Sequence, residues 1–173
     1  MNDRIGFSTT KKWLSRLIRW FTGAQVSHAW ILYFDIDFGR EMVLEATLEG
    51  VRIIPLEIFE KHNIVVKTFI PTHEIKQGLA KAGSILGAGY DFSGLLGMLW
   101  VMFGRWFKKK WQNPLDNVHS LFCSEFVARV LWWSSYPGTE YWEPRNMTPA
   151  DLYGFFQAQE AKEARLNRHL DKV

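Results

Sequence analysis

Cys123 is the residue of this 173-residue chain best placed to act as a nucleophile. It lies in the segment LFCSEFVARVL, residues 121–131, whose apolar side chains recur at helical spacing. That spacing predicts a helix from about Ser120, its N-cap, to Trp133, with the cysteine in the first turn. Unpaired backbone N–H groups and the helix dipole stabilise an anion there, so the pattern favours a reactive thiolate. The alternative is a small buried side chain, the usual state of a lone cysteine.

A nucleophilic thiol needs a base, and His28 is the strongest candidate among the five histidines. It precedes AWILYF at residues 29–34, a short apolar run typical of a buried strand. An imidazole at the entrance of a strand can face a cleft while the strand holds its backbone rigid. The alternative is a histidine at the edge of the core, satisfied by a backbone carbonyl. Of the others, His119 precedes the cysteine by four residues, and His62, His73 and His169 lie in polar or terminal stretches.

Glu45 is an acidic residue inside an apolar, strand-like segment, VLEATLEGV at residues 43–51. This segment should neighbour the strand that begins at His28, because only a short turn separates the two. A carboxylate in such a place costs free energy unless it is paired. Hydrogen-bonded to an imidazole, it would orient the ring and stabilise its protonated form, as the third member of a catalytic triad does. Alternation with Leu44 and Ala46 also permits a position that faces away from the core.

The strands and helices that the sequence predicts around these residues form an α+β fold in a single domain, residues 1–173. Four short apolar runs closed by turn residues predict four strands, and the short connections between them favour an antiparallel meander. Helices follow: one at residues 74–86, then the cysteine helix, then a polar C-terminal helix that frays after Glu160. The predicted strands cover residues 29–34, 42–47, 51–54 and 64–70.

Two segments combine aromatic and basic side chains. Residues 11–21 predict an amphipathic helix with a basic outer face, and we expect it to pack on the core in preference to contacting a membrane. Residues 95–111 form an aromatic insertion that ends in Lys108–Lys110. Its aromatic side chains are expected in the core or lining the substrate cleft, and contact with an anionic membrane surface is the alternative.

Composition excludes several classes of protein. Lys and Arg number 21 against 18 Asp and Glu, and the resulting charge of +3 is too small to predict a nucleic-acid partner. A single cysteine excludes an intramolecular disulfide and a multi-cysteine metal cage, and no metal site is expected. The N-terminal segment lacks the pattern of a secretory signal, and the longest apolar run, residues 92–104, is shorter than the roughly 20 residues of a spanning helix. A cytoplasmic location is therefore expected.

Five short motifs occur in an order that resembles a known family. The motifs are SHAWILY at 27–33, VLEATLEGVRIIPL at 43–56, GYDFSGLLG at 89–97, FCSEFVARVL at 122–131 and MTPADLY at 147–153. Over residues 24–153 the chain is therefore similar to the circularly permuted NlpC/P60 papain-like enzymes, specifically the bacterial YiiX-like group. In ordinary papain-like enzymes the cysteine precedes the histidine, whereas here the histidine comes first and the cysteine helix comes late.

The resemblance implies a permuted papain-like fold in which an antiparallel sheet packs against the helix that bears the nucleophile. Matched residue by residue, Cys123 corresponds to the family's nucleophile, His28 to its general base and Glu45 to the acidic residue that orients the histidine. The chemistry so implied requires neither a metal nor an organic cofactor, and none is expected.

The same match implies supporting roles for three further residues. Tyr90 corresponds to a tyrosine near the active site, and its phenol O–H would donate to an oxyanion or a substrate carbonyl. The alternative for Tyr90 is an aromatic core residue with its hydroxyl at the surface. Ser124 is expected to lend its backbone N–H to the oxyanion hole, and Glu125 to order the start of the helix.

The function implied is hydrolysis of an amide or peptide bond, typically in cell-wall peptides, through a thioacyl-enzyme. A second hypothesis is a lipid-ester thioesterase or acyltransferase similar to lecithin:retinol acyltransferase, which shares the permuted order and would act at a membrane surface. A third is a non-catalytic binding module, although such a module has no need for all three residues. The expected partner is thus a peptide, amide or lipid-ester substrate, and the sequence predicts no oligomeric state.

Overall fold

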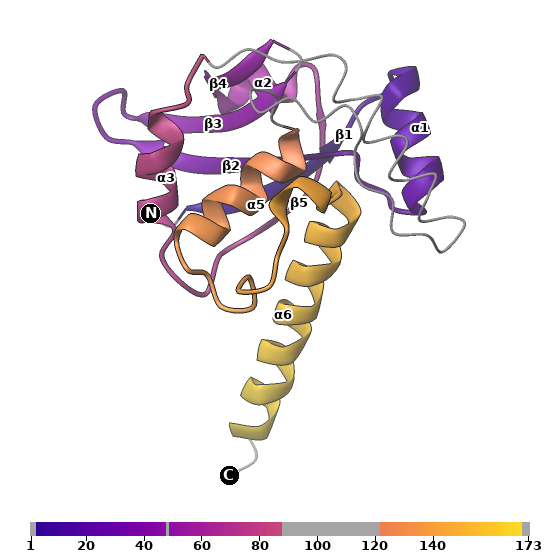
Figure 1. Ribbon diagram of the computed structural model, residues 1–173, viewed down its shortest axis with the longest axis vertical. Coiled ribbons are helices and arrows are strands. Elements are labelled where there is room, and N and C mark those ends of the chain that lie inside the picture. Colours follow the sequence, from indigo (N-terminus) through magenta and orange to yellow (C-terminus); the bar gives the residue numbers. More distant parts are fainter. Residues whose placement is uncertain (1–2, 48, 88–121, 171–173) are drawn as a thin grey trace.

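A computed structural model describes residues 3–47, 49–87 and 122–170 of the chain (Figure 1). Within these ranges the protein is an α+β structure, as predicted, with helices on both faces of one antiparallel sheet. The predictions for Tyr90, His119 and residues 95–111 lie outside the described residues.

The sheet has five antiparallel strands in the order β4-β3-β2-β1-β5. The run from β2 to β4 is the meander that the short connections predict. β2 pairs with β3 and β3 pairs with β4, so the segments of His28 and Glu45 are neighbours in the sheet. The strands are β1 (Arg4–Thr9), β2 (His28–Asp35), β3 (Arg40–Thr47), β4 (Gly50–Pro55) and β5 (Ile64–Phe69).

The prediction that the fourth strand continues the meander is wrong, because an unpredicted strand, β1, lies between β2 and β5. β5 therefore pairs with β1 and lies at the edge opposite to β4. β1 buries Ile5 and Phe7 completely, but it has only six residues and includes Gly6, which weakens its strand pattern. A short helix, α2 (Leu56–Glu60), separates β4 from β5 along the chain and was also not predicted.

Gly6 is required in β1 because the Trp30 side chain of β2 lies against it. A Cβ atom at this position would come within 2.4 Å of the indole ring. We expect Gly6→Ala to lower the free energy of unfolding by about 1–3 kcal/mol, the usual cost of overpacking. Gly83→Ala is the matched control, since a Cβ at Gly83 meets nothing within 4 Å and alanine favours a helix. Urea denaturation compares the two, and equal stability of both variants would contradict this account of Gly6.

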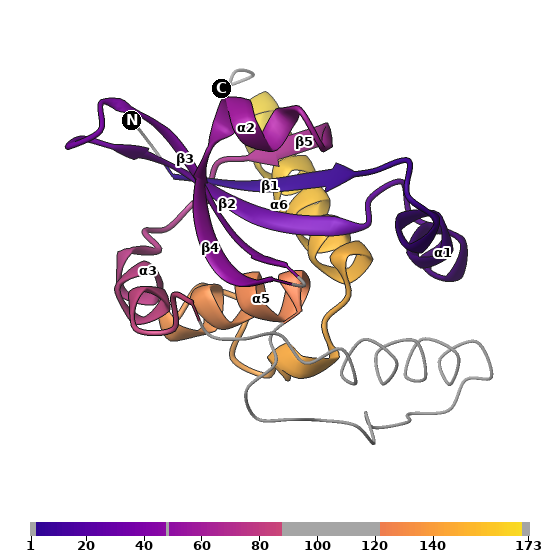
Figure 2. The same ribbon diagram turned by 90° about the horizontal axis from the view of Figure 1, so that it is seen from above.

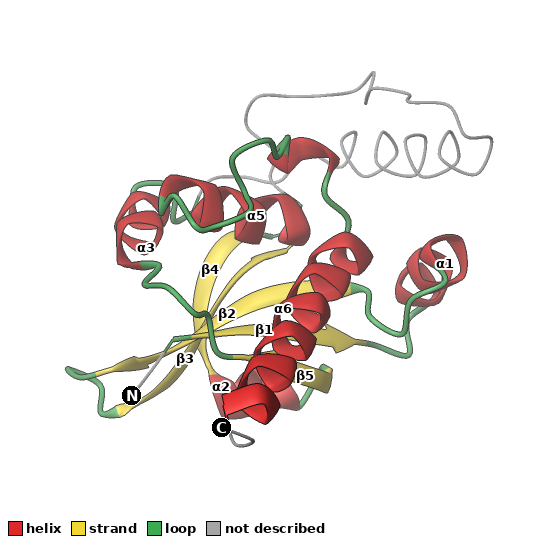
Figure 3. Cartoon of the chain, turned by 90° about the horizontal axis from the view of Figure 1, so that it is seen from below, coloured by secondary structure: helices red, strands yellow, loops and turns green. Residues whose placement is uncertain are grey.

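Two helices cover one face of the sheet and a third covers the other. α5 (Cys123–Trp133) and α6 (Pro149–Leu170) pack on the same apolar face, which includes Ile31 and Leu44, and α3 (Lys76–Gly83) contacts α5 (Figures 2 and 3). On the opposite face, Phe59 of α2 packs against Trp30, Leu32 and Val43. This division follows the alternation of side chains along β2 and β3.

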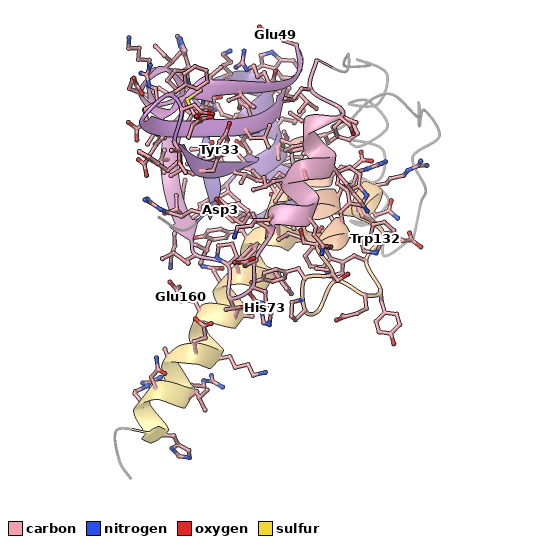
Figure 4. All side chains as sticks on the ribbon, turned by 90° about the vertical axis from the view of Figure 1, so that its left-hand side faces the viewer. Asp3, Tyr33, Glu49, His73, Trp132 and Glu160 are labelled. Atoms are coloured by element: carbon pink, nitrogen blue, oxygen red, sulfur yellow. The ribbon has the colours of Figure 1, made fainter. Side chains whose placement is uncertain are left out.

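The predicted helices occur, with different boundaries. The predicted 11–21 helix is α1 (Trp13–Thr22), and the predicted 74–86 helix is α3. α6 continues to Leu170 and is not frayed after Glu160, where Figure 4 shows it leaving the body of the protein. No helix within the described ranges is both long and apolar enough to cross a bilayer.

α5 begins with Phe122 as its N-cap and Cys123 as its first helical residue, so the cysteine lies in the first turn, as predicted. The predicted N-cap, Ser120, lies outside the described residues. The Glu125 carboxylate accepts a hydrogen bond from the backbone N–H of Phe122, and Arg129 holds the same carboxylate from one turn further on at 2.7 Å. Glu125 therefore orders the start of the helix, as predicted, by reaching back as a capping residue does.

Candidate active site

The candidate site forms where the first turn of α5 meets the start of β2. Cys123 is half-buried, and its sulfur is hydrogen-bonded to the ring of His28. Two backbone N–H groups also donate to the sulfur, from Ala29 of β2 and from Ser124 of α5. Packing of α5 across the sheet thus brings together the cysteine and the histidine, which are far apart in the sequence.

The other ring nitrogen of His28 contacts Glu45. His28 Nε2 lies 2.6 Å from Glu45 Oε2, which leaves Nδ1 as the ring atom for Cys123. The Glu45 side chain is 2% exposed and that of His28 is 16% exposed, so the carboxylate is fixed in the interior while the imidazole reaches toward the surface. The structure therefore brings together Cys123, His28 and Glu45 in that order.

Arg52 is part of the site and was not singled out from the sequence. It is the cross-strand partner of Glu45 in the β3–β4 hairpin, and its Nε and Nη2 both lie 2.9 Å from Glu45 Oε1. Its Nη1 contacts the exposed Glu49 at 2.5 Å, which Figure 4 places at the outer edge of the molecule. The signal was available: Glu45 and Arg52 stand on either side of a tight turn, where a hairpin register pairs opposite charges.

Phe59 of α2 is a second unpredicted member of the surroundings. Its ring stacks on that of His28, with centroids 6.2 Å apart and planes at 25°. Phe59 is itself fully buried against Trp30, at 4.7 Å between centroids. The imidazole of His28 is therefore held by the Glu45 carboxylate at one edge and by the Phe59 ring against its face. Nothing in the sequence pattern marked Phe59, because the short helix that carries it was not predicted.

Electrostatics within the site favour charged forms of all the groups. Burial would raise the pKa of the Cys123 thiol, but the positive charge and hydrogen bond of His28, with the two backbone donors, outweigh burial and lower it. Burial would lower the pKa of His28, yet the Cys123 thiolate and the Glu45 carboxylate raise it to about 10. Burial opposes the Glu45 charge too, but His28 and then Arg52 lower the pKa of its carboxyl. These shifts all favour a thiolate–imidazolium pair backed by a carboxylate–guanidinium pair.

The other predicted site residue within the described ranges is Ser124. Its hydroxyl donates to the backbone carbonyl of Met147 at 2.7 Å and so ties α5 to the segment that follows the short η1 helix (Pro144–Asn146). Its backbone N–H donates to the Cys123 sulfur. The described residues contain no group of three or more His, Cys, Asp or Glu side chains that could hold a metal ion.

Comparison with known proteins gives structural matches but no sequence matches. No protein-family model matches the sequence, and a comparison with curated proteins found no match. Among solved structures, the chain is similar to the crystal structure of the metalloprotein YiiX from Escherichia coli O157:H7, with 23% sequence identity and a TM-score of 0.49. The match covers 77% of this chain and 64% of the YiiX chain, so this chain spans less than two thirds of the length of that protein.

Proposed function

We propose that the protein is a papain-like cysteine hydrolase that cleaves an amide or peptide bond through a thioacyl-enzyme. One observation carries the proposal: a half-buried Cys123 at a helix N-terminus is hydrogen-bonded to His28, whose ring is held by Glu45. A nucleophile, a base and an orienting group in this order are the parts that nucleophilic acyl transfer needs. The antiparallel sheet with the cysteine helix packed on it is consistent with a permuted papain-like fold, and we include that fold in the proposal.

The proposed reaction has two steps. In the first, the Cys123 thiolate attacks the substrate carbonyl, the oxyanion forms beside the backbone donors at the helix start, and His28 gives its proton to the leaving amine. The C–N bond breaks and an acyl group remains on the sulfur. In the second step His28 removes a proton from water, which attacks the thioester and releases the acid and the thiolate. Glu45 keeps the imidazole oriented and stabilises its protonated form in both steps.

An acyl group should be trapped on Cys123 when the protein is quenched with acid after incubation with peptide and lipid-ester libraries. Mass spectrometry of the digested protein would locate the added mass on the peptide that contains Cys123. Cys123→Ala should show no adduct, and His28→Ala should accumulate far less, because the thiolate is then not formed. If no library acylates a Cys123 that iodoacetamide labels readily, the hydrolase proposal is wrong and the binding-module hypothesis gains support.

A lipid-ester substrate is the second candidate, and one observation favours it. Trp13 and Trp20 stand exposed on a basic helix, α1, which packs against Phe122 immediately before Cys123. Such a helix suits an enzyme that meets its substrate at a lipid surface. The same trapping experiment separates the candidates, because the mass of the adduct reports either a peptidyl or a fatty-acyl group.

A further inference from the structure

The outer side of α1 carries two tryptophans whose side chains are largely exposed. Trp13 is 72% exposed and Trp20 is 67% exposed, and the exposed Arg16 lies between them in sequence. At about 100° per residue, these three side chains fall within an arc of about 60° around the helix. Large aromatic side chains gathered on an exposed face mark an interaction site more often than an inert surface.

Basic residues lie beside these tryptophans. Arg16 is exposed within the same arc, Lys11 and Lys12 are exposed immediately before the helix begins, and Arg19 is half-buried one turn after Ser15. The helix contains no acidic residue. Within the described part of the chain, no carboxylate forms an ion pair with any of these four side chains. Tryptophan beside lysine and arginine matches the interface of a bilayer, where indole rings lie at the level of the headgroups and cations meet lipid phosphates.

The inner side of α1 fixes the helix next to the candidate site. Leu14, Ile18 and Phe21 pack on Phe122, the residue before Cys123. Ser15 contacts Ser27, the residue before His28, at 2.5 Å between hydroxyl oxygens. A surface bound by the outer side of α1 would therefore lie close to the entrance of the site.

We propose that the outer face of α1, defined by Lys12, Trp13, Arg16 and Trp20, docks on the surface of an anionic bilayer. The two indole rings enter the headgroup region and the basic side chains pair with phosphates. Docking leaves the packing of α1 unchanged, because the docking residues lie on the side opposite to Leu14 and Ile18. The proposal does not depend on the chemistry of Cys123.

A second exposed apolar cluster provides the contrast. The β2–β3 turn exposes Ile36 (86%) and Phe38 (71%), and it lies at the end of the molecule opposite to α1 (Figures 1 and 2). Asp35 and Asp37 flank these residues, so an anionic surface would repel this turn. The two clusters match in apolar exposure and differ in charge, which makes the turn a control for α1.

The test is co-sedimentation of the full chain with phosphatidylcholine vesicles prepared with and without phosphatidylglycerol, at low and at moderate salt. We expect binding to the anionic vesicles, weakened by salt, and little binding to the neutral ones. Each basic residue near an anionic surface contributes about fivefold to binding, so Lys12→Gln with Arg16→Gln should weaken binding about thirtyfold. Trp13→Ser with Trp20→Ser should remove most of the binding that persists at moderate salt.

Two control variants remove the same number of positive charges, or of exposed apolar side chains, from other parts of the surface. Lys162→Gln with Arg165→Gln removes two exposed charges from α6, and Ile36→Ser with Phe38→Ser removes the apolar turn. Both should bind like the unmodified chain. Equal binding to neutral and anionic vesicles would overturn the proposal, as would α1 variants that bind normally while a Lys108–Lys110→Gln variant does not. Repeating the measurement with Cys123→Ala keeps it independent of activity.

Discussion

Replacing His28 with alanine should slow the alkylation of Cys123 by iodoacetamide about a hundredfold at pH 6.5. His28 lowers the pKa of the Cys123 thiol through its positive charge and its hydrogen bond, and we expect the thiol of the unmodified protein to be largely ionised at pH 6.5. Without His28, burial dominates and raises the thiol pKa, and even an ordinary thiol with a pKa of about 8.5 is only roughly 1% ionised at pH 6.5. The rate of labelling as a function of pH measures the effect directly.

The pH profile itself has an expected shape. In the unmodified protein, the labelling rate should rise through the lowered pKa of Cys123 and then stay level until His28 loses its proton at a pKa of about 10. In His28→Ala the rise should move above the range of an ordinary thiol. His62→Ala, at an exposed histidine, is the control and should leave the profile unchanged. Coincident profiles for the unmodified protein and His28→Ala would mean that Cys123 is an ordinary thiol.

Glu45→Gln should lower the free energy of unfolding by about 3 kcal/mol or more, because it leaves two cations facing a neutral amide in the interior. Glu45 is 2% exposed and is the shared acceptor of His28 and Arg52. Loss of the carboxylate also removes one of the two anions that raise the pKa of His28. The variant should therefore be less stable in urea and should also show a downward shift of the histidine titration by NMR.

Glu49 provides a matched control for Glu45, because it contacts the same arginine. Glu49 contacts Arg52 at 2.5 Å, but its side chain is 77% exposed. Glu49→Gln should therefore change the stability by less than about 1 kcal/mol, as exposed ion pairs do. If the two variants lose equal stability, the interior position of Glu45 has no special role in holding the site.

The parts of the fold that could be predicted are those marked by sequence patterns within a short stretch of the chain. The β2–β4 meander and the cysteine helix were recognised because apolar runs, turn residues and helical spacing mark them within a few residues of each other. β1 was missed because it is short and contains a glycine, a residue depleted in strands, and the reason for that glycine is Trp30 of another strand. The position of β5 was then also wrong, since β5 pairs with the unpredicted β1 and not with β4 as a continued meander requires.

The residues of the candidate site also divide into those marked by a local sequence pattern and those that are not. Cys123, His28 and Glu45 could be selected because each is a polar residue in an apolar or helix-start context, and the structure places the three in contact. Arg52 needed the hairpin register, which a pattern of residue types shows only when the turn is placed correctly. Phe59 needed the stacking of one element on another, which no local pattern contains. Thus Cys123, His28 and Glu45 could be selected from local patterns, whereas Arg52 required the register of the hairpin and Phe59 required the packing of one element on another.

The placement of Glu45 and Arg52 on one hairpin, next to the strand of His28, has a consequence for the order in which the protein folds. These three residues belong to consecutive strands joined by short turns, and contacts of small sequence separation form fastest. Cys123 reaches them only when α5 docks, after closure of a much longer loop. We therefore expect the contacts among His28, Glu45 and Arg52 to form early in folding and the contact with Cys123 to form late. The reactive thiolate is thus stabilised only once the chain has reached its final topology.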